Sequence, residues 1–350
     1  MRRRTFLTAA AAMTAVPAGA GTSLYVPPEE APHERTLMQW PVSRKVHPDQ
    51  SFLESVQQTI ADIANAIVEF EPVAMLMDAA HKANARQFLS DAVEIWEIET
   101  EDLWCRDSGP LFARKGAGEL VVSHIRFNGW GRKQIHKADG QIARKVAERL
   151  GLEIVDSGLV GEAGGVEHDG HGLLMAHESS WVIGNRNPGL TRTQIADRLM
   201  AAYGAKQILW APGVRDRDIT DYHIDSLARF TSPARVLMNL PDDPEPGDPF
   251  HQAALTTHDR IEAKGWHVDV IPEPVELRTD QHDFVASYVN FYVCNGAVIL
   301  PEFGDPETDP IAVDALSRHF PGREMIALDT DPLGMIGGGI HCATQQMPKL

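Results

Sequence analysis

The chain has 350 residues, three cysteines and a formal net charge of −17 at pH 7. This length is enough for one large domain or two ordinary ones, with roughly three quarters of the unfolded surface buried on folding. The acidic balance argues against a nucleic-acid partner and favours a small cationic one. Because three cysteines are an odd number, at least one thiol should be free.

The first residues predict an export signal. Residues 1–7 contain paired arginines, an apolar alanine-rich run follows, and residues 18–20 have the small-x-small pattern of a cleavage site. We therefore expect residues 1–20 to be a twin-arginine signal peptide that is cleaved after Ala20 and directs the protein to the periplasm. The alternative is a basic tail. No stretch reaches the roughly 20 apolar residues of a transmembrane helix, so no stable membrane anchor is expected.

After this signal, apolar runs alternate with amphipathic segments. Residues 27–41 read as an extended segment because prolines interrupt them. Residues 51–70 place apolar side chains at helical spacing, and Ser51 with Glu54 has the spacing of a capping box. The same criteria predict strands at 73–77, 93–98, 120–122, 173–175, 181–183, 208–210 and 236–238, and helices at 80–89, 140–150, 193–203, 249–264 and 310–319.

This interleaving of helices and strands indicates an α/β architecture. Residues 285–301 read as two strands that meet at Asn295-Gly296, which suits a type I′ hairpin turn, so a purely parallel sheet is disfavoured. No glycine-rich dinucleotide fingerprint or phosphate loop follows a predicted strand, and no nucleotide cofactor is expected. Since no linker divides them, residues 21–350 are predicted to form a single domain.

The stretch at 337–346 is the most informative part of the chain. Three consecutive glycines, which include Gly338 and Gly339, come shortly before Cys342. Such a backbone lets a substrate press against the main chain beside a thiol. Cys342 is therefore a candidate nucleophile, and the alternative is a buried structural cysteine. Cys105 and Cys294 could pair, although two separate buried thiols are the favoured interpretation.

Two other turns carry groups suited to proton transfer and cation binding. Asp107 lies between Arg106 and a Gly-Pro turn, where the alternative is a surface ion pair between these two residues. His223 and Asp225 would project from the same face of a strand. An imidazole and a carboxylate in one cleft suit acid–base chemistry, whereas the alternative is a solvated strand edge.

A third cluster, at residues 162–172, combines acids, histidines and glycines. His168, Asp169 and His171, with the later His177, are all potential metal ligands. We do not favour a metal site, because the spacing matches no closed zinc pattern and a hairpin turn accounts for Asp169. No metal is therefore expected.

These pieces resemble the agmatine deiminase and bacterial (Porphyromonas-type) peptidylarginine deiminase family over nearly all of the chain after the signal. The resemblance implies a fold that periodicity does not reveal, a five-bladed α/β propeller (pentein fold) with pseudo-fivefold symmetry and the active site in its central channel. The most specific pieces are 104–110, 127–131, 185–188, 223–225, 290–292 and 337–346.

The resemblance also implies residue roles. Cys342 matches the nucleophile and His223 the general acid and base. Asp107 and Asp225 match the carboxylates that hold the guanidinium, and Glu162 matches the acid that supports the histidine. The residues expected to contact the substrate are Trp104, Trp130, Asn290, Gly338 and Gly339.

The implied reaction is hydrolytic deimination of a small cationic guanidinium substrate without a cofactor. Agmatine, giving N-carbamoylputrescine and ammonia through a covalent amidino-thioether intermediate, is the first expectation. Peptidyl or free arginine, giving citrulline, is the alternative, and a non-catalytic periplasmic binding protein for cationic amines is a second. Ala163, Tyr222 and Ser226 depart from the family's usual residues and put the substrate in doubt more than the chemistry. A homo-oligomer is compatible with the sequence.

Overall fold

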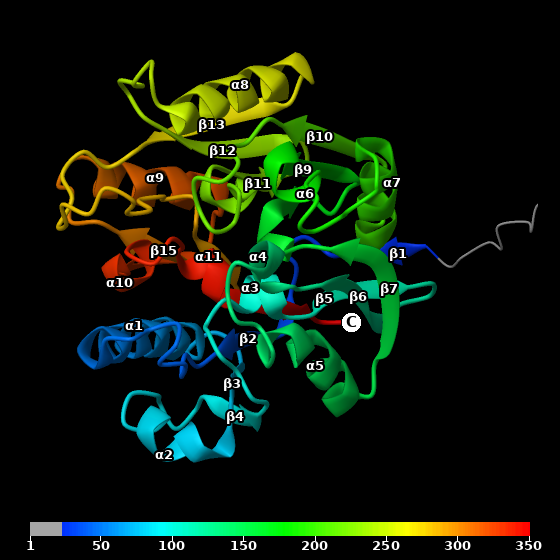
Figure 1. Cartoon of the computed structure of the whole chain (residues 1–350). Helices are drawn as coiled ribbons and strands as arrows, with labels where there is room; N and C mark the ends of the chain where they lie inside the picture. Colours follow the sequence, from blue (N-terminus) through cyan, green and yellow to red (C-terminus); the bar gives the residue numbers. More distant parts are fainter. Residues whose placement is uncertain (1–22) are drawn as a thin grey trace, which may run out of the picture.

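The computed structural model describes residues 23–350, so the predicted signal peptide at 1–20 lies outside the described part. Five small sheets make up this part of the chain, and longer helices lie around them at the periphery (Figure 1). In order within each sheet, the strands are β1 (Leu24–Tyr25), β5 (Leu111–Lys115), β6 (Glu119–Arg126) and β7 (Glu153–Val160); β10 (Gln207–Ala211), β9 (Leu173–His177) and β8 (Val166–His168); β11 (Ala228–Ser232), β12 (Arg235–Leu240) and β13 (His267–Pro272); β14 (Tyr292–Cys294), β15 (Ala297–Glu302) and β16 (Glu324–Asp329); and β17 (Thr344–Pro348), β2 (His33–Gln39), β3 (Val73–Met77) and β4 (Glu94–Glu97).

Each sheet repeats one pattern, an antiparallel pair of strands followed by a parallel strand. A parallel pair needs a crossover connection, and in every sheet this connection contains a helix. The interleaved α/β pattern predicted from the sequence is confirmed. The crossover helices are α1 (Gln50–Ile67), α5 (Ile142–Leu150), α6 (Glu178–Trp181) with α7 (Arg192–Tyr203), α8 (Pro249–Ala263) and α9 (Thr308–His319).

The remaining helical segments are single turns. The turns α3 and α11 lie near the middle of the molecule, between the sheets (Figure 1). They contact each other and carry two of the sequence pieces that predicted the site. These segments are η1 (Ala79–His81), α2 (Lys82–Ala85), α3 (Cys105–Ser108), α4 (Gly129–Arg132), η2 (Asp139–Gln141), η3 (Ala163–Gly165), η4 (Ile224–Ser226), α10 (Asp331–Gly334) and α11 (Ile340–Ala343).

The last strand joins the two ends of the described chain. β17 pairs antiparallel with β2, with Gln345 opposite Leu37. Because α11 directly precedes β17, this pairing fixes Cys342 at the centre, next to strands from the start of the chain. A sheet built from both ends also resists opening, since neither end can leave without breaking the ladder.

Apolar side chains at helical spacing hold the helices on their sheets. On α1, the side chains of Val56, Ile60, Ile63 and Ile67 are fully buried in one cluster that includes Met75 of β3. Burying each of these contributes about 1.5–3 kcal/mol relative to leaving it exposed. The periodicity that predicted this helix is therefore the face that docks it.

Several local predictions are wrong. Residues 181–183 do not form a strand, because the buried ring of Trp181 ends α6 and donates from Nε1 to the Gly165 carbonyl. The helix predicted at 80–89 is reduced to η1 and α2. Asp49, rather than Ser51, caps α1 by accepting from the Phe52 amide.

The hairpin at Asn295-Gly296 is confirmed, since Cys294 pairs with Ala297 across a two-residue connection. Its turn is not type I′, because Gly296 has a positive φ of 88° whereas Asn295 does not. Hydrogen bonds between the Asn295 side chain and the backbone of His33 hold the turn in place.

The three cysteines remain separate thiols, as the sequence favoured. Cys105 and Cys294 are buried in different apolar clusters, and Cys342 is half-buried. No helix within residues 23–350 combines the length and hydropathy that crossing a bilayer would require.

Candidate active site

Cys342 lies on the single turn α11, where Asn290 holds it from two sides. The Asn290 amide Nδ2 donates to Cys342 Sγ at 3.3 Å, and Oδ1 accepts from the backbone amides of His341 at 2.9 Å and Cys342 at 3.4 Å. Asn290, expected to contact the substrate, therefore lies against the candidate nucleophile itself.

The glycines before Cys342 are required by close packing. A Cβ at Gly338 would lie 2.5 Å from the Trp104 ring, and one at Gly339 would lie 2.6 Å from Asn290 Oδ1. Real Cβ atoms do not approach so closely, so glycine lets α11 dock on its neighbours. Trp104 is 8% exposed, and its role as a wall for the substrate stays a prediction.

His223 lies between two buried carboxylates. Its Nδ1 is 3.7 Å from Asp107 Oδ1, and its Nε2 is 3.3 Å from Glu162 Oε2. The strand predicted for His223 and Asp225 is wrong. His223 instead caps the 3₁₀ turn η4, which contains Asp225, and this turn brings both side chains to the site.

Gly164 is the point around which these groups meet. A Cβ at this position would lie 2.7 Å from Asp107 Oδ1, 3.0 Å from Asp225 Oδ2 and 3.1 Å from His223 Nδ1. Asp225 Oδ2 also lies 3.5 Å from Cys342 Sγ. The structure therefore brings together the thiol, the imidazole and both aspartates that the sequence singled out.

Trp130 fixes the orientation of Asp107. Its indole Nε1 donates to Asp107 Oδ2 at 2.8 Å, and its ring packs edge-on against Phe127 with centroids 4.9 Å apart. Four successive residues, Gly129–Arg132, have positive φ angles of 69°, 53°, 78° and 68°. For the two non-glycine residues this conformation costs about 1–2 kcal/mol each. Trp130 is only 2% exposed, so its predicted contact with a substrate stays untested.

Arg186 supports the histidine from behind, a role that sequence reasoning missed. Its Nε donates to both oxygens of Glu162, at 3.0 and 2.8 Å, and its Nη1 donates to Asp221 Oδ2 at 2.7 Å. Lys133 pairs with the other oxygen of Asp221 at 2.8 Å. Since Lys133 directly follows the left-handed turn, a chain of contacts runs from this turn through Arg186 to His223. The signal available was the position of Arg186 within the 185–188 piece.

Burial and neighbouring charges set the protonation states of the site. Burial raises the pKa of Asp107 to about 6, against the lowering influence of His223. Burial alone would lower the pKa of His223, but Asp107, Glu162 and Asp225 raise it to about 9. Near neutral pH, His223 is therefore a cation and Asp107 is largely ionised.

The thiol and its nearest carboxylate are shifted in opposite directions. Burial, and then Asp225 and Asp107, hold the pKa of Cys342 well above the ordinary thiol value. Burial opposes ionisation of Asp225, but His341, with His223 and Arg229, nevertheless lowers the pKa of Asp225. The site without substrate therefore contains a neutral thiol beside an ionised carboxylate.

The neighbours of Asp107 and Tyr222 clarify two sequence observations. Arg106 does not pair with Asp107 but points the other way, with Nη2 2.9 Å from Glu29 Oε2. Tyr222, which departs from the family's usual glycine, has a positive φ of 68°. Glycine would adopt this conformation without the strain that tyrosine accepts here.

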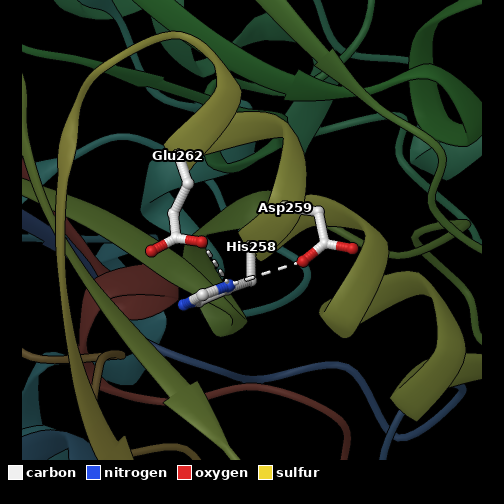
Figure 2. A group of neighbouring side chains, drawn as sticks. All are labelled: His258, Asp259 and Glu262. Atoms are coloured by element: carbon white, nitrogen blue, oxygen red, sulfur yellow. Dashed lines mark ion pairs between the residues drawn. The ribbon is translucent and has the colours of Figure 1, made fainter.

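The ligand atoms of the histidine-rich cluster do not gather around one point in the described part of the chain. Asp169 closes the turn between β8 and β9 by accepting from the amides of His171 and Leu173. His177 instead binds the Tyr222 carbonyl. Within residues 23–350, one group has metal-like proximity, His258 with Asp259 and Glu262 on α8 (Figure 2). Both acids are exposed and lie 3.8 Å from the imidazole, as is common for a solvated helix face.

The fold and the site together define an α/β protein of five repeated sheets in which a thiol, an imidazole and two carboxylates converge. A family model of Porphyromonas-type peptidyl-arginine deiminases matches residues 25–348. The chain therefore belongs to this family.

Individual relatives span nearly the whole chain. A putative agmatine deiminase of Streptomyces coelicolor is 35% identical over 93% of this chain and 98% of its own length. The solved agmatine deiminase of Enterococcus faecalis is 27% identical, with a TM-score of 0.86 over 95% of this chain and 98% of its own. A putative arginine deiminase from Porphyromonas gingivalis is 28% identical, with a TM-score of 0.81 over 93% of this chain and 98% of its own.

Proposed function

We propose that the protein is a hydrolase that deiminates agmatine to N-carbamoylputrescine and ammonia. The observation that carries the proposal is the convergence of His223, Asp107 and Asp225 beside Gly164, together with Cys342 Sγ at 3.5 Å from Asp225 Oδ2, which brings a thiol, an imidazole and two carboxylates to one site. A sequence relative and a solved structure similar to this chain are both named as agmatine deiminases, and this supports agmatine as the substrate.

In the proposed first half-reaction, Asp107 and Asp225 hold the guanidinium through charge-assisted hydrogen bonds. As the guanidinium binds, the Cys342 thiol loses its proton to solvent, and the resulting thiolate attacks the guanidinium carbon from above its plane to form a C–S bond. His223, protonated near neutral pH, then gives its proton to the departing nitrogen, and the C–N bond breaks to release ammonia. An amidino-thioether remains on Cys342.

In the second half-reaction, the now neutral imidazole of His223 accepts a proton from water. The resulting hydroxide adds to the amidino carbon. The C–S bond then breaks, the proton of the new hydroxyl group passes to the departing sulfur, and the neutral ureido product leaves with the Cys342 thiol restored. Glu162, 3.3 Å from His223 and fixed by Arg186, holds the imidazole in position through both steps.

Substrate binding itself is proposed to activate the thiol. Burial and the charges of Asp225 and Asp107 disfavour the thiolate more than the hydrogen bonds from Asn290 and the Gly339 backbone favour it, so the pKa of Cys342 stays well above the ordinary value. A bound guanidinium would neutralise both carboxylates and add a positive charge beside Sγ. Ionisation of Cys342 is therefore coupled to arrival of the cation, which protects the resting thiol from other electrophiles.

The finer points of architecture and location are also proposals. Five sheets with one shared strand order, closed by the β17–β2 pairing, support a five-bladed propeller with pseudo-fivefold symmetry and a single domain over residues 21–350. The paired arginines and the cleavage pattern in residues 1–20 support twin-arginine export to the periplasm. In that location agmatine would be used outside the cytoplasm, as a source of putrescine.

Arginine, free or at a peptide end, is the second candidate substrate. The similarity to a putative arginine deiminase and the family's own description favour it. An arginine substrate would require a group that receives a carboxylate or a backbone, whereas agmatine carries a distal ammonium. A cationic-amine binding protein without turnover is the remaining candidate.

The test is a substrate panel of agmatine, free arginine and a peptide ending in arginine, scored for ureido product and ammonia with the wild type and Cys342→Ser. We expect agmatine to give the highest kcat/KM and the serine variant to release no ammonia. Preference for the peptide would show that peptidyl arginine, rather than agmatine, is the substrate. Binding of agmatine without any turnover would favour the interpretation as a cationic-amine binding protein. Undiminished turnover by Cys342→Ser would refute the proposed nucleophile.

A further inference from the structure

The imidazole of His341, which directly precedes Cys342, lies between two carboxylates. Its Nδ1 is 2.7 Å from Asp225 Oδ2, and its Nε2 is 3.1 Å from Glu29 Oε2. The Asp225 oxygen that His341 contacts is the one that lies 3.5 Å from Cys342 Sγ. His341 therefore connects the site to Glu29, which lies four residues before His33, the first residue of β2.

Glu29 belongs to the segment between β1 and β2, near the start of the described chain. Its side chain is buried and has four partners from four different parts of the fold. Oε2 contacts Arg106 at 2.9 Å as well as His341, and Oε1 accepts from Arg229 at 3.1 Å and from the Val293 amide at 2.9 Å. A side chain held at so many points is a rigid support for the imidazole it contacts.

The two carboxylates beside His341 are satisfied differently by a neutral and by a protonated ring. A neutral imidazole has one N–H, so one of its two nitrogens would direct a lone pair at a buried carboxylate. An imidazolium donates from both nitrogens and satisfies both carboxylates. The remaining charged groups that face this imidazole agree with a cation, since Glu167 lies 3.9 Å from Nε2 and Arg106 donates to the His341 carbonyl rather than to its ring.

The charges of the groups around His341 balance with this assignment. Glu29, Glu167 and Asp225 supply three buried carboxylates, and Arg106 and Arg229 supply two cations. One further positive charge, on His341, makes the group neutral, and buried charges are tolerated when they are paired.

We propose that Glu29 is a positioning residue of the active site, which holds His341 as an imidazolium and through it keeps Asp225 ionised and aimed at the substrate beside Cys342. Glu29 acts three contacts away from the thiol, through His341 and Asp225, and does not touch the substrate. The segment between β1 and β2 therefore contributes a positioning residue to the active site. The catalytic part of this inference rests on the proposed deimination.

The direct test is ¹⁵N NMR of the histidine side chains in the wild-type protein, with the His341 signals assigned by loss in His341→Gln. The spectrum is recorded at a pH about one unit above the ordinary histidine pKa of about 6.5. We expect two protonated ring nitrogens on His341. A single protonated nitrogen would overturn the proposal, and this measurement needs no turnover, so it is independent of the proposed function.

The matched variants are Glu29→Gln and, as a control, Glu34→Gln, which changes an exposed acid at the start of the adjoining strand β2. At the same pH, Glu29→Gln should leave one His341 nitrogen unprotonated and lower kcat/KM for agmatine about 10- to 100-fold, the range expected for loss of a hydrogen bond to a charged group. Glu34→Gln should change neither. A folded Glu29→Gln protein with unchanged kcat/KM would overturn the positioning role, and if this variant does not fold, the wild-type spectrum still decides the imidazolium. A wild type that releases no ammonia would instead refute the proposed function.

Discussion

Arg186 Nε donates to both carboxylate oxygens of Glu162, and one of these oxygens, Oε2, lies 3.3 Å from His223 Nε2. The side chains of Arg186 and Glu162 are almost completely buried. Because an unpaired buried charge is costly, each charge requires the other, and together they fix one face of the imidazole. The histidine that moves protons in the proposed reaction therefore depends on an arginine that touches no substrate.

Arg186→Lys should impair the reaction although it keeps the charge. A lysine has no planar fork, so it cannot bridge Glu162 and Asp221 as the guanidinium does. We expect kcat to fall about 10- to 100-fold, the effect of losing one or two hydrogen bonds between charged groups. Arg192→Lys, which alters a surface ion pair with Glu178, is the control and should leave kcat unchanged. Steady-state kinetics measure kcat for both variants. An Arg186→Lys variant with the same kcat as Arg192→Lys would contradict the proposed support of His223 by Arg186.

The pH profile of kcat/KM for agmatine should be bell-shaped. As the pH falls through about 6, Asp107 becomes protonated and loses its grip on the cation, so activity declines on the acid side. As the pH rises through about 9, His223 loses the proton that it gives to the leaving nitrogen, so activity declines on the alkaline side. An optimum below pH 6 would contradict these assignments.

Asp225→Asn should change the reactivity of Cys342 and the rate of turnover in opposite directions. The Asp225 carboxylate raises the pKa of the nearby thiol, so its neutralisation should speed alkylation of Cys342 by iodoacetamide. The same change removes a ligand of the guanidinium, so ammonia release should fall at least about tenfold. Peptide mapping of the alkylated protein gives the first rate. Asp62→Asn, on the exposed face of α1, should alter neither rate.

Gly338→Ala should abolish activity for a steric reason, since the substitution changes no charge. The added Cβ would overlap the Trp104 ring and approach Cys342 Sγ to 3.4 Å, so α11 and its thiol would have to shift. Overpacking of this kind costs about 1–3 kcal/mol of stability. Gly184→Ala is the matched control, because a Cβ there meets no atom within 4 Å. Thermal unfolding and kcat, measured together, should change in the first variant and stay constant in the second.

Local periodicity predicted the regular elements well. The face of α1 and the fully buried strand β3 were both visible in the sequence, because their apolar spacing follows the geometry of a single element. The strand predicted at residues 181–183 is wrong because an apolar run of three residues has no clear period. Such a run does not reveal whether its residues are buried in a strand or at the end of a short helix.

The residue types of the site could be predicted from the sequence, but the contacts between these residues could not. The chemistry of Cys342, His223 and the aspartates could be inferred from their turns and from the family resemblance. The contact between Asp225 and Cys342 spans 117 positions, and no spacing rule reaches so far. The sequence alone assigns no role to Glu29 or Arg186, and their importance appears only when the fold buries them among charged partners.

The most direct test of the account is the mass of the protein after brief mixing with agmatine and quenching in acid. The reaction should be followed by intact mass spectrometry and by fragmentation of the peptide that carries Cys342. We expect a transient adduct on this sulfur equal to agmatine minus ammonia, which disappears as the ureido product accumulates. Steady product formation with no such adduct at any time, or an adduct on another residue, would contradict a covalent reaction at Cys342.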